Sequence, residues 1–489
     1  MPTNPMPADG NAILLSSVAT RLDRLPIAAF HRRMVYLLGY IFFFELGDLN
    51  SFGFAAPAVR EAWHLSLATI GRITSASFVG MFVGATTAGW LSDRLGRKRA
   101  LIVTTTWYST FSLLNAFAWN VPSLAVARLL TGVGLSAMTV VAITYISEMF
   151  PASRRGTYQA WIMTIGLCGI PATAYVARFL IPAAPWGWRA VFVWGSLAII
   201  FPWLAHRLEE SPRWYERHGR LAEAEAVLDR IERQVQAESG PLEALPARSD
   251  AGRADSAGAP GAPAASPDLA SLSRARRQAA ASPPSSGAAQ ERGGFTALVA
   301  SGSLKRLALL VAIWIAQTLG FYGFNAWVPT LLTEHGFSIV RSLEQASVMQ
   351  IGAVPGAWIA ASISDRWERK SLIAIVAVAV ATCGMIYGLS FRTSTIVVFG
   401  FLVAMGQQVF APLLYAYTPE CFPTEARNTG TGLSYGIGRL GNAFGPLIVA
   451  YLFVTFGYTS VFAYIAVCWA TVAVLITLFG PRTKGRALA

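Results

Sequence analysis

The stretch YISEMFPASRRG, which begins at Tyr145, returns in related form as YTPECFPTEARN from Tyr417. Both stretches fit Tyr-x-x-Glu-x-x-Pro-x-x-x-Arg, and their first residues are 272 positions apart (417 minus 145). The same offset relates GWLSDRLGRK, which begins at Gly89, to ASISDRWERK, which begins at Ala361. Two motif pairs with one offset indicate that the chain contains two copies of one structural unit.

The composition predicts an integral membrane protein. Hydrophobic residues make up 54% of the 489 residues, and charged residues only 13%. A soluble globular protein of this size carries about 25% charged residues. The apolar residues are gathered in runs of about 20, which is the length that a helix needs to cross a bilayer.

Twelve such segments can be recognised, six in each copy of the unit. They lie at about 34–57, 71–92, 99–119, 122–145, 157–180, 188–206, 305–332, 343–364, 371–391, 394–418, 428–453 and 457–480. The predicted fold is therefore an all-α membrane protein with twelve transmembrane helices in two pseudo-symmetric six-helix bundles. Parallel duplication of this kind is a known transporter architecture, with the substrate site at mid-depth between the halves.

The predicted domains are an N-terminal bundle (1–206), a cytoplasmic loop (207–304) and a C-terminal bundle (305–489). The loop begins with a stretch of helical periodicity, and from about 239 to 294 it becomes rich in Ala, Pro, Ser and Gly. Such a segment cannot bury enough apolar area to fold, so we expect it to be disordered. Basic residues gather in the N-terminal segment, in alternate connections and in the C-terminal tail, which predicts that both termini are cytoplasmic and that the protein lies in the cell (inner) membrane.

The motifs resemble those of the major facilitator superfamily of transporters. The stretch from Gly89 to Lys98 is similar to the signature between the second and third helices of that family, and Arg128-x-x-x-Gly132-x-Gly134 resembles its fourth-helix motif. EESPRW at 209–214 and PRTKGR at 481–486 are similar to motifs of the sugar-porter and organic-ion-transporter branch. The first helix, ELGDLNSFGFAAP, resembles bacterial aromatic-acid and nicotinate proton symporters, although Leu46-Gly47 departs from their pattern.

Each copy of the unit is predicted to carry a charged gate at the cytoplasmic ends of its helices. Charge-assisted hydrogen bonds between such residues would close this side of the membrane. The alternative is that these charges only anchor helix ends and orient insertion. The proposed gate residues are Asp93, Arg97, Glu148 and Arg155 in the first copy, and Asp365, Arg369, Glu420 and Arg427 in the second.

Five ionisable residues fall inside apolar segments: Glu45, Asp48, Arg128, Arg178 and Arg439. A charge at this depth is costly and usually faces a partner or a cavity. Counting about 1.5 Å per residue places Asp48 and Arg128 at the same level. The resemblance to proton-coupled sugar porters implies that these two form the proton-coupling pair, with Glu45 as a second proton site or a pocket residue. The alternative for the pair is a static ion pair, and Arg178 is expected to reach the membrane interface.

Arg439 lies near mid-depth in GIGRLGNAFGP, a string that resembles the eleventh helix of organic-anion transporters. Its guanidinium is a rigid fork that suits a carboxylate. The functional interpretation is capture of an organic anion. The alternative is a pairing with Glu45, and both hold if the substrate displaces Glu45.

The seventh helix, AQTLGFYGFNAWVP, lacks one glutamine and the asparagine of the sugar-porter pattern and is more aromatic than that pattern. Aromatic side chains suit a flat ring, although ordinary helix packing is the alternative for each of them. The expected pocket members beside Arg439 are Gln317, Tyr322, Asn325 and Gln407.

Together these observations predict a secondary transporter that imports a small organic acid, of the aromatic or heteroaromatic kind, together with protons. No enzymatic activity, cofactor, metal or nucleic-acid partner is expected, and the chain is expected to be a monomer with the proton as its coupling ion. Within transport, a sugar or polyol proton symporter is the alternative. A non-transporting nutrient sensor that signals through the 207–304 loop is the alternative of another class.

Overall fold

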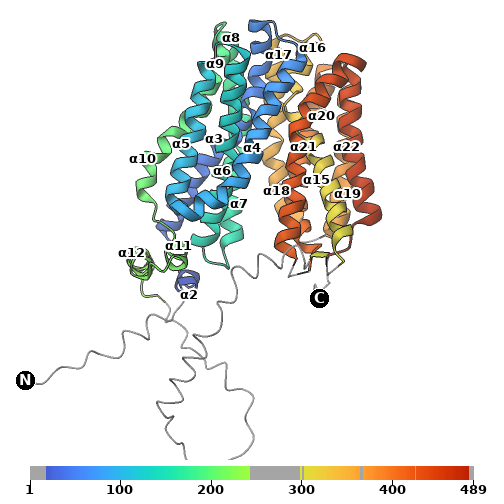
Figure 1. The fold of residues 1–489 in the computed structure, drawn as a ribbon. Coiled ribbons are helices and arrows are strands. Elements are labelled where there is room, and N and C mark those ends of the chain that lie inside the picture. The colour runs from blue at the N-terminus through green and yellow to red at the C-terminus, as the bar shows by residue number, and fades with distance from the viewer. Residues whose placement is uncertain (1–17, 243–297, 300–301, 364–366, 424–425, 484–489) are drawn as a thin grey trace, which may run out of the picture.

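The computed structural model describes residues 18–242, 298–299, 302–363, 367–423 and 426–483, and all the regular secondary structure in these ranges is helical. Long helices run side by side, and three short or amphipathic helices lie at one end of them (Figure 1). These three are α2 (Val18–Asp23), α11 (Pro212–Arg217) and α12 (Leu221–Ser239). We call this end of the molecule the α12 end and the opposite one the α16 end.

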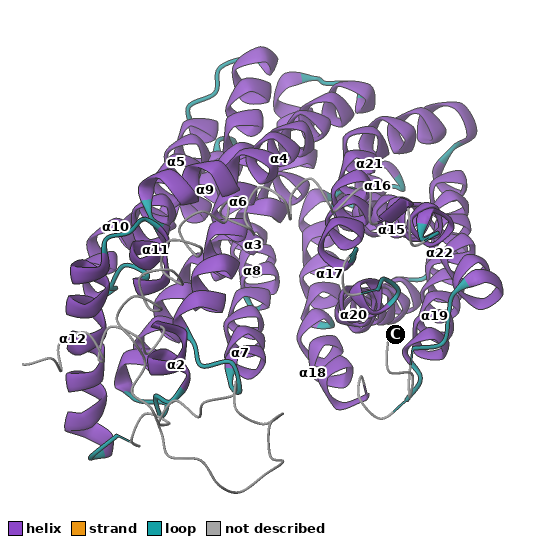
Figure 2. Cartoon of the chain, turned by 60° about the horizontal axis from the view of Figure 1, so that its bottom comes forward, coloured by secondary structure: helices purple, strands orange, loops and turns teal. Residues whose placement is uncertain are grey.

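The long helices form two groups that follow one another along the chain (Figure 2). The N-terminal bundle contains α3 (Ala29–Trp63), α4 (Leu67–Leu95), α5 (Arg97–Ala116), α6 (Val121–Met149), α7 (Arg155–Leu167), α8 (Gly169–Ala183) and α9 (Gly187–Gly195), which continues through η1 (Ser196–Ile200), α10 (Phe201–Leu204) and η2 (Ala205–Arg207). The C-terminal bundle contains α15 (Leu304–Asn325), α16 (Val328–Glu334), α17 (Ile339–Ile351), α18 (Ala353–Ile363), α19 (Arg369–Leu389), α20 (Thr393–Glu420), α21 (Arg427–Phe456) and α22 (Tyr458–Phe479).

Ten helical segments of the described residues are long and apolar enough to cross a membrane. Two further long helices, α3 and α5, run alongside them and carry more polar residues, so the arrangement is consistent with the twelve predicted spans. Large apolar side chains such as Val126, Phe179 and Val467 are more than half exposed on the outer surface of the bundles. An apolar surface of this kind fits a lipid environment and not water.

Small residues allow α4 and α6 to pack very closely. A Cβ atom added to Gly80 or Gly84 would lie 1.9 or 2.0 Å from a backbone oxygen of α6, that of Leu129 or Val133 respectively. Gly132 meets the backbone of α4 in the same way, with the oxygen of Ser77 at 2.2 Å. Close backbone approach through small residues is a general means of helix association in membranes.

The two bundles touch along α4 and α21, along α8 and α17, and where α3 meets α16. Between α8 and α17, the hydroxyl of Ser347 donates a hydrogen bond to the carbonyl of Ala174 at 3.0 Å. Between α4 and α21, a Cβ atom at Gly71 would lie 3.0 Å from the Pro446 oxygen. The interface between the two bundles is therefore formed mainly by these three pairs of helices.

The predicted connection 207–304 contains α11 and α12, which pack against the N-terminal segment α2. Arg21 of α2 forms ion pairs with Asp229 and Glu232 of α12, both at 2.7 Å. Arg24 also reaches Glu232, at 2.8 Å. From residue 243 onward, the segment predicted to be disordered (239–294) lies outside the described residues.

Candidate functional site

Asp48 and Arg128 are brought together in the middle of the N-terminal bundle. The Asp48 carboxylate, on α3, lies 3.7 Å from Nη1 of Arg128, on α6, and the two side chains are 0% and 2% exposed. This separation is an ion pair without a direct hydrogen bond, because an N–H donor needs about 2.7–3.2 Å. The two charges therefore attract each other without being locked together.

Neighbouring hydroxyl groups provide the hydrogen bonds of this pair. Ser112 of α5 donates to Oδ1 of Asp48 at 2.6 Å, and Ser51 donates to the same oxygen at 3.2 Å. Nε of Arg128 donates to the Ser77 hydroxyl at 3.0 Å. Each charged group thus has hydrogen-bond partners in the bundle other than the opposite charge. The two groups can therefore move apart and still keep hydrogen bonds.

Glu45 lies one turn before Asp48 on α3 and is 4% exposed. Its Oε1 accepts a hydrogen bond from the Thr139 hydroxyl of α6 at 3.0 Å. Its other oxygen, Oε2, is buried and has no hydrogen-bond partner among the described residues. Glu45 is therefore a buried carboxyl group with one oxygen free to carry a proton.

Arg439 reaches across the interface from α21 of the C-terminal bundle. Its Nη1 donates to the Ser136 hydroxyl of α6 at 3.0 Å, and its guanidinium lies 4.7 Å from the ring centre of Tyr435. The side chain is half-buried. Among the described residues no carboxylate lies within 4.0 Å of it, so the predicted alternative of a direct ion pair with Glu45 is not formed in this structure.

Three aromatic rings form a cluster next to Arg439. Tyr435 lies 5.0 Å from Trp314 of α15 and 5.5 Å from Tyr415 of α20, measured between ring centres. Trp314 and Tyr415 are 5.0 Å apart. None of the three is among the predicted pocket residues. Tyr435 precedes Arg439 by four residues and so shares its helix face, which is the one signal in the sequence that could have identified it.

Tyr322 also lies at the interface between the bundles. Its ring meets that of Phe78, on α4, at 4.8 Å in an edge-to-face arrangement. Both residues line a cavity of about 20 Å³ that also contacts Arg128. A cavity of this size holds about one water molecule, so the space beside Tyr322 is almost filled in this conformation.

The predicted amide residues separate into two places. Asn325 donates to Oε1 of Gln407 at 2.6 Å and accepts from Gln350 at 3.1 Å, so these three amides bind one another inside the C-terminal bundle. Gln317 accepts a hydrogen bond from its neighbour Thr318 at 3.2 Å. Gln407 and Asn325 are thus bonded to each other, and within the part of the chain that the structure describes neither forms a hydrogen bond with Arg439.

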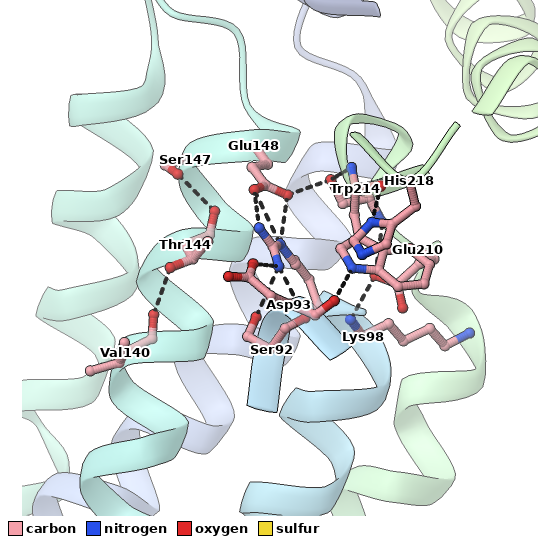
Figure 3. Close-up of polar contacts among 12 residues, drawn as sticks. Ser92, Asp93, Lys98, Val140, Thr144, Ser147, Glu148, Glu210, Trp214 and His218 are labelled. Carbon is pink, nitrogen blue, oxygen red and sulfur yellow. Dashed lines mark hydrogen bonds and ion pairs between the residues drawn. The ribbon is translucent and has the colours of Figure 1, made fainter. Parts of the chain in front are cut away.

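Three of the four predicted gate residues of the first copy, Asp93, Arg97 and Glu148, form a network at the α12 end (Figure 3). Arg97 is 2% exposed; it donates from Nε and Nη2 to Glu148 at 2.9–3.1 Å and from Nη1 to Asp93 at 2.6 Å. The Asp93 side chain is 67% exposed. Arg155 is the first residue of α7 and makes no ion pair with these three residues within 4.0 Å.

The EESPRW segment docks onto this network, which the sequence did not predict. The hydroxyl of Ser211 donates to Glu148 at 2.5 Å, and Nε1 of Trp214 donates to the carbonyl of Asp93 at 2.7 Å (Figure 3). Glu210 accepts from the backbone N–H of Lys98 at 2.9 Å. Gly96, at a φ of 89°, lies against Glu210, so this turn needs glycine both for its backbone conformation and for space.

In the second copy, Arg369 forms an ion pair with Glu420. This pair corresponds to Arg97 and Glu148 of the first copy, at the offset of 272 residues. Arg427 begins α21, and Asp365 lies outside the described residues. The two copies therefore share the central Arg–Glu pair of the predicted gate.

The α16 end carries ion pairs that join the two bundles. Arg60 of α3 pairs with Glu334 of α16, beside a groove of about 700 Å³. Arg178 of α8 pairs with Glu344 of α17 at 2.9 Å. The expectation that Arg178 only reaches the membrane interface is thus incomplete, because its partner comes from a segment 166 residues further along the chain.

Comparison with known proteins agrees with this architecture. The family model described as Major Facilitator Superfamily matches residues 38–395 and 345–488. A protein of Bacillus subtilis (strain 168), YyaJ, whose name refers to metabolite transport without a substrate, is 42% identical over 97% of both chains. The niacin transporter NiaP of Acinetobacter baylyi is 28% identical over 96% of this chain and 98% of its own.

A gallate transporter of Pseudomonas putida is 32% identical over 87% of this chain and 86% of its own. Among solved structures, a partially occluded, inward-open conformation of the xylose transporter XylE from E. coli superimposes with a TM-score of 0.70. It covers 94% of this chain and 100% of that one at 16% identity, so it shows the shared fold alone. The chain belongs to the Major Facilitator Superfamily and is a multi-pass membrane transporter, not an enzyme.

Proposed function

We propose that the protein is a proton-coupled symporter that imports a small aromatic or heteroaromatic carboxylate across the cell (inner) membrane. In this proposal the α12 end faces the cytoplasm and the α16 end faces outward, as the distribution of basic residues predicts. Relatives named for niacin and gallate transport support this substrate class, because both compounds are aromatic acids.

The observation that carries the proposal is the half-buried Arg439 at the interface of the bundles. Its guanidinium has one hydroxyl partner, Ser136, and no carboxylate within 4.0 Å among the described residues. A guanidinium presents several donors in a planar fork that matches a carboxylate. The adjoining rings of Trp314, Tyr415 and Tyr435 offer a surface on which the flat ring of an aromatic acid can pack.

The proposed proton sites are Glu45 and Asp48 in the N-terminal bundle. Asp48 lies 3.7 Å from Arg128, and a movement of α6 relative to α3 would change the balance between its charged and neutral forms. Such a dependence of protonation on conformation is what couples a proton gradient to transport. Coupling therefore requires that both acids can gain and lose a proton. Replacing an acid with its neutral amide, Asn or Gln, removes this ability.

The direct test is uptake into liposomes that contain the purified protein. A thermal-shift screen of aromatic acids, sugars and amines selects the ligand, and a pH gradient, acidic at the α16 face, drives its accumulation. Asp48→Asn is expected to abolish accumulation against a gradient while ligand binding persists. Accumulation that is the same with and without the pH gradient would refute proton coupling.

A sugar or polyol is the second candidate substrate. The hydrogen-bonded amides of Asn325, Gln350 and Gln407 are groups of the type that bind neutral hydroxyl-rich ligands. In this structure the amides bind one another, so they support a sugar substrate less strongly than Arg439 supports a carboxylate substrate. Stabilisation by sugars and by none of the aromatic acids in the same screen would favour this alternative.

A further inference from the structure

Arg439 and Glu45 are held on one face of α6. Ser136, which accepts from Arg439 at 3.0 Å, and Thr139, which donates to Glu45 at 3.0 Å, are three residues apart on that helix. Residues with this spacing lie one above the other on a helix surface. A positive group from one bundle and an acidic group from the other are therefore placed about one helical turn apart.

Glu45 and Asp48 have different surroundings, although they are neighbours on α3. Asp48 has Arg128 of its own bundle at 3.7 Å and accepts from two hydroxyls. Glu45 accepts from one hydroxyl, and its buried Oε2 has no hydrogen-bond partner among the described residues. Among the described residues, the cation whose charge acts on Glu45 is Arg439, which belongs to the other bundle.

The remaining titratable groups around Glu45 do not replace this cation. Among the described residues, Asp48 on the same helix, Tyr108 of α5 and Tyr322 of α15 interact with Glu45 electrostatically. Asp48 is itself acidic, and a tyrosine is neutral at ordinary pH. The ionised form of Glu45 therefore depends on how much of the positive charge of Arg439 is available to it.

We propose that Glu45 is the acid that takes up a proton when the substrate binds, because the substrate carboxylate neutralises Arg439, and that Ser136 and Thr139 are the positioning residues of this exchange. The inference rests on the proposed function, since it assigns Arg439 to the substrate. One proton moves from solution to a carboxylate oxygen of Glu45, and no other bond is made or broken. Asp48 with Arg128 then forms a second site that responds to conformation and not to the substrate.

The experiment measures protons taken up on ligand binding. Isothermal titration calorimetry of the purified full-length protein is carried out in buffers with different ionisation enthalpies, with nicotinate or the aromatic acid that gives the largest thermal shift. The wild-type protein is expected to take up protons as the acid binds. Glu45→Gln is expected to bind the acid without proton uptake, whereas Asp48→Asn retains the uptake.

Two conservative variants separate this role from a merely structural one. Thr139→Val removes a donor to ionised Glu45, so the pH profile of binding is expected to move up by about one pH unit. Ser136→Ala removes the partner that Arg439 has without substrate, so it alters affinity and leaves the pH profile in place. Thr144→Val is the matched control, since its hydroxyl donates to the carbonyl of Val140 of its own helix, α6, at 3.0 Å.

The outcomes distinguish the inference from the proposed function. If no aromatic acid binds, both are wrong. If the acid binds to the wild-type protein without proton uptake, or if Glu45→Gln still takes up protons, the inference is overturned and the substrate class stands. If Thr139→Val does not differ from Thr144→Val in its pH profile, Thr139 is not a positioning residue and that part of the inference is overturned.

Discussion

At the scale of single residues, the buried charge of Arg97 depends on Glu148. The two side chains are 2% and 7% exposed and share three hydrogen bonds. Removing one member of a buried ion pair leaves an uncompensated charge, which costs about 3–5 kcal/mol. Glu148→Ala is expected to decrease the free energy of unfolding by an amount near the lower end of this range, because Asp93 still contacts Arg97. Thermal unfolding of the purified protein measures this, with exposed Arg99→Ala as a control; equal midpoints for both variants would contradict the expectation.

The sequence predicts the charged residues of the site better than their neutral partners. Asp48, Arg128, Glu45 and Arg439 stand out because an ionisable group inside an apolar segment is rare and costly. The hydroxyls that hold them, such as those of Ser112, Ser136 and Thr139, do not stand out. The side chains of serine and threonine commonly form hydrogen bonds with the backbone of their own helix. The presence of such a residue in the sequence therefore does not indicate a partner on another helix.

At the scale of elements, the contact of α4 with α6 leaves no room for a methyl group. A Cβ atom at Gly84 would lie 2.0 Å from the carbonyl oxygen of Val133. Forcing extra atoms into a well-packed contact costs about 1–3 kcal/mol. Gly84→Ala is therefore expected to lower the unfolding midpoint, measured by the same thermal unfolding. Gly89→Ala on the same helix is the control, because nothing lies within 4 Å of its added Cβ; equal losses in both variants would show that the close contact is not the cause.

The docking of α2 on α12 is expected to depend on pH through Glu232. Burial raises the pKa of its carboxyl, but hydrogen bonds from Arg21 and Arg24 outweigh this effect and hold the pKa below its ordinary value. Because the folded-state pKa is lowered, its stabilising contribution is present above the unfolded pKa of about 4.3 and is lost as the pH falls through the lower folded value. The protection of the α2 amides, measured as hydrogen exchange relative to the intrinsic rate at the same pH, should therefore fall at acidic pH. Glu232→Gln should already show fast exchange at neutral pH, unlike exposed Glu223→Gln; slow exchange in Glu232→Gln would contradict this.

The ends of the helices show where sequence patterns are insufficient. The predicted span 305–332 is interrupted after Asn325, and α16 begins at Val328 with Pro329 in its first turn. The α3 helix extends to Ala29 and Trp63, beyond the predicted 34–57, because its charged ends continue the helix outside the apolar stretch. Apolar runs thus predict the part of a helix that lies in hydrocarbon, whereas its termini depend on local capping and turns.

At the scale of the whole molecule, the ion pairs of the α16 end join the two bundles. Arg60–Glu334 is half-buried and Arg178–Glu344 is more exposed. Outward opening must separate them, because each pair has one member in each bundle. Such pairs contribute about 1 kcal/mol or less, so Glu334→Gln is expected to increase the outward-open population about fivefold or less.

Labelling of a cysteine introduced at Leu65, which is half-buried in the groove beside this pair, measures the opening. A membrane-impermeant maleimide should react faster in the Glu334→Gln background than in the parent, and the exchanged pair Arg60→Glu with Glu334→Arg should restore the slow rate. Glu61→Gln, in the same groove, is the control. An equal labelling rate in all four proteins would mean that the ion pair does not hold this end closed.

The duplication in the sequence accounts for the architecture but not for how the halves meet. The 272-residue offset predicts two equivalent units, and the Arg–Glu pair recurs in both. The contacts between the bundles, such as Arg60–Glu334 and Ser136–Arg439, join residues 274 and 303 positions apart and have no counterpart in any local pattern. They depend on the relative orientation of the halves, which a single sequence does not specify.

The central claim is that Arg439 holds the carboxylate of the substrate, and the dissociation constant of an aromatic acid tests it most directly. A charge-assisted hydrogen bond contributes about 1.5–3 kcal/mol, so Arg439→Ala is expected to raise Kd about 10- to 100-fold. Arg439→Lys, which keeps the charge without the planar fork of donors, should have a Kd between those of the wild-type protein and Arg439→Ala. Arg72→Ala, which removes an exposed arginine of the α16 end whose side chain donates to Thr69 of its own helix, should leave Kd unchanged. A correctly folded Arg439→Ala protein that binds the acid with wild-type Kd would contradict the account.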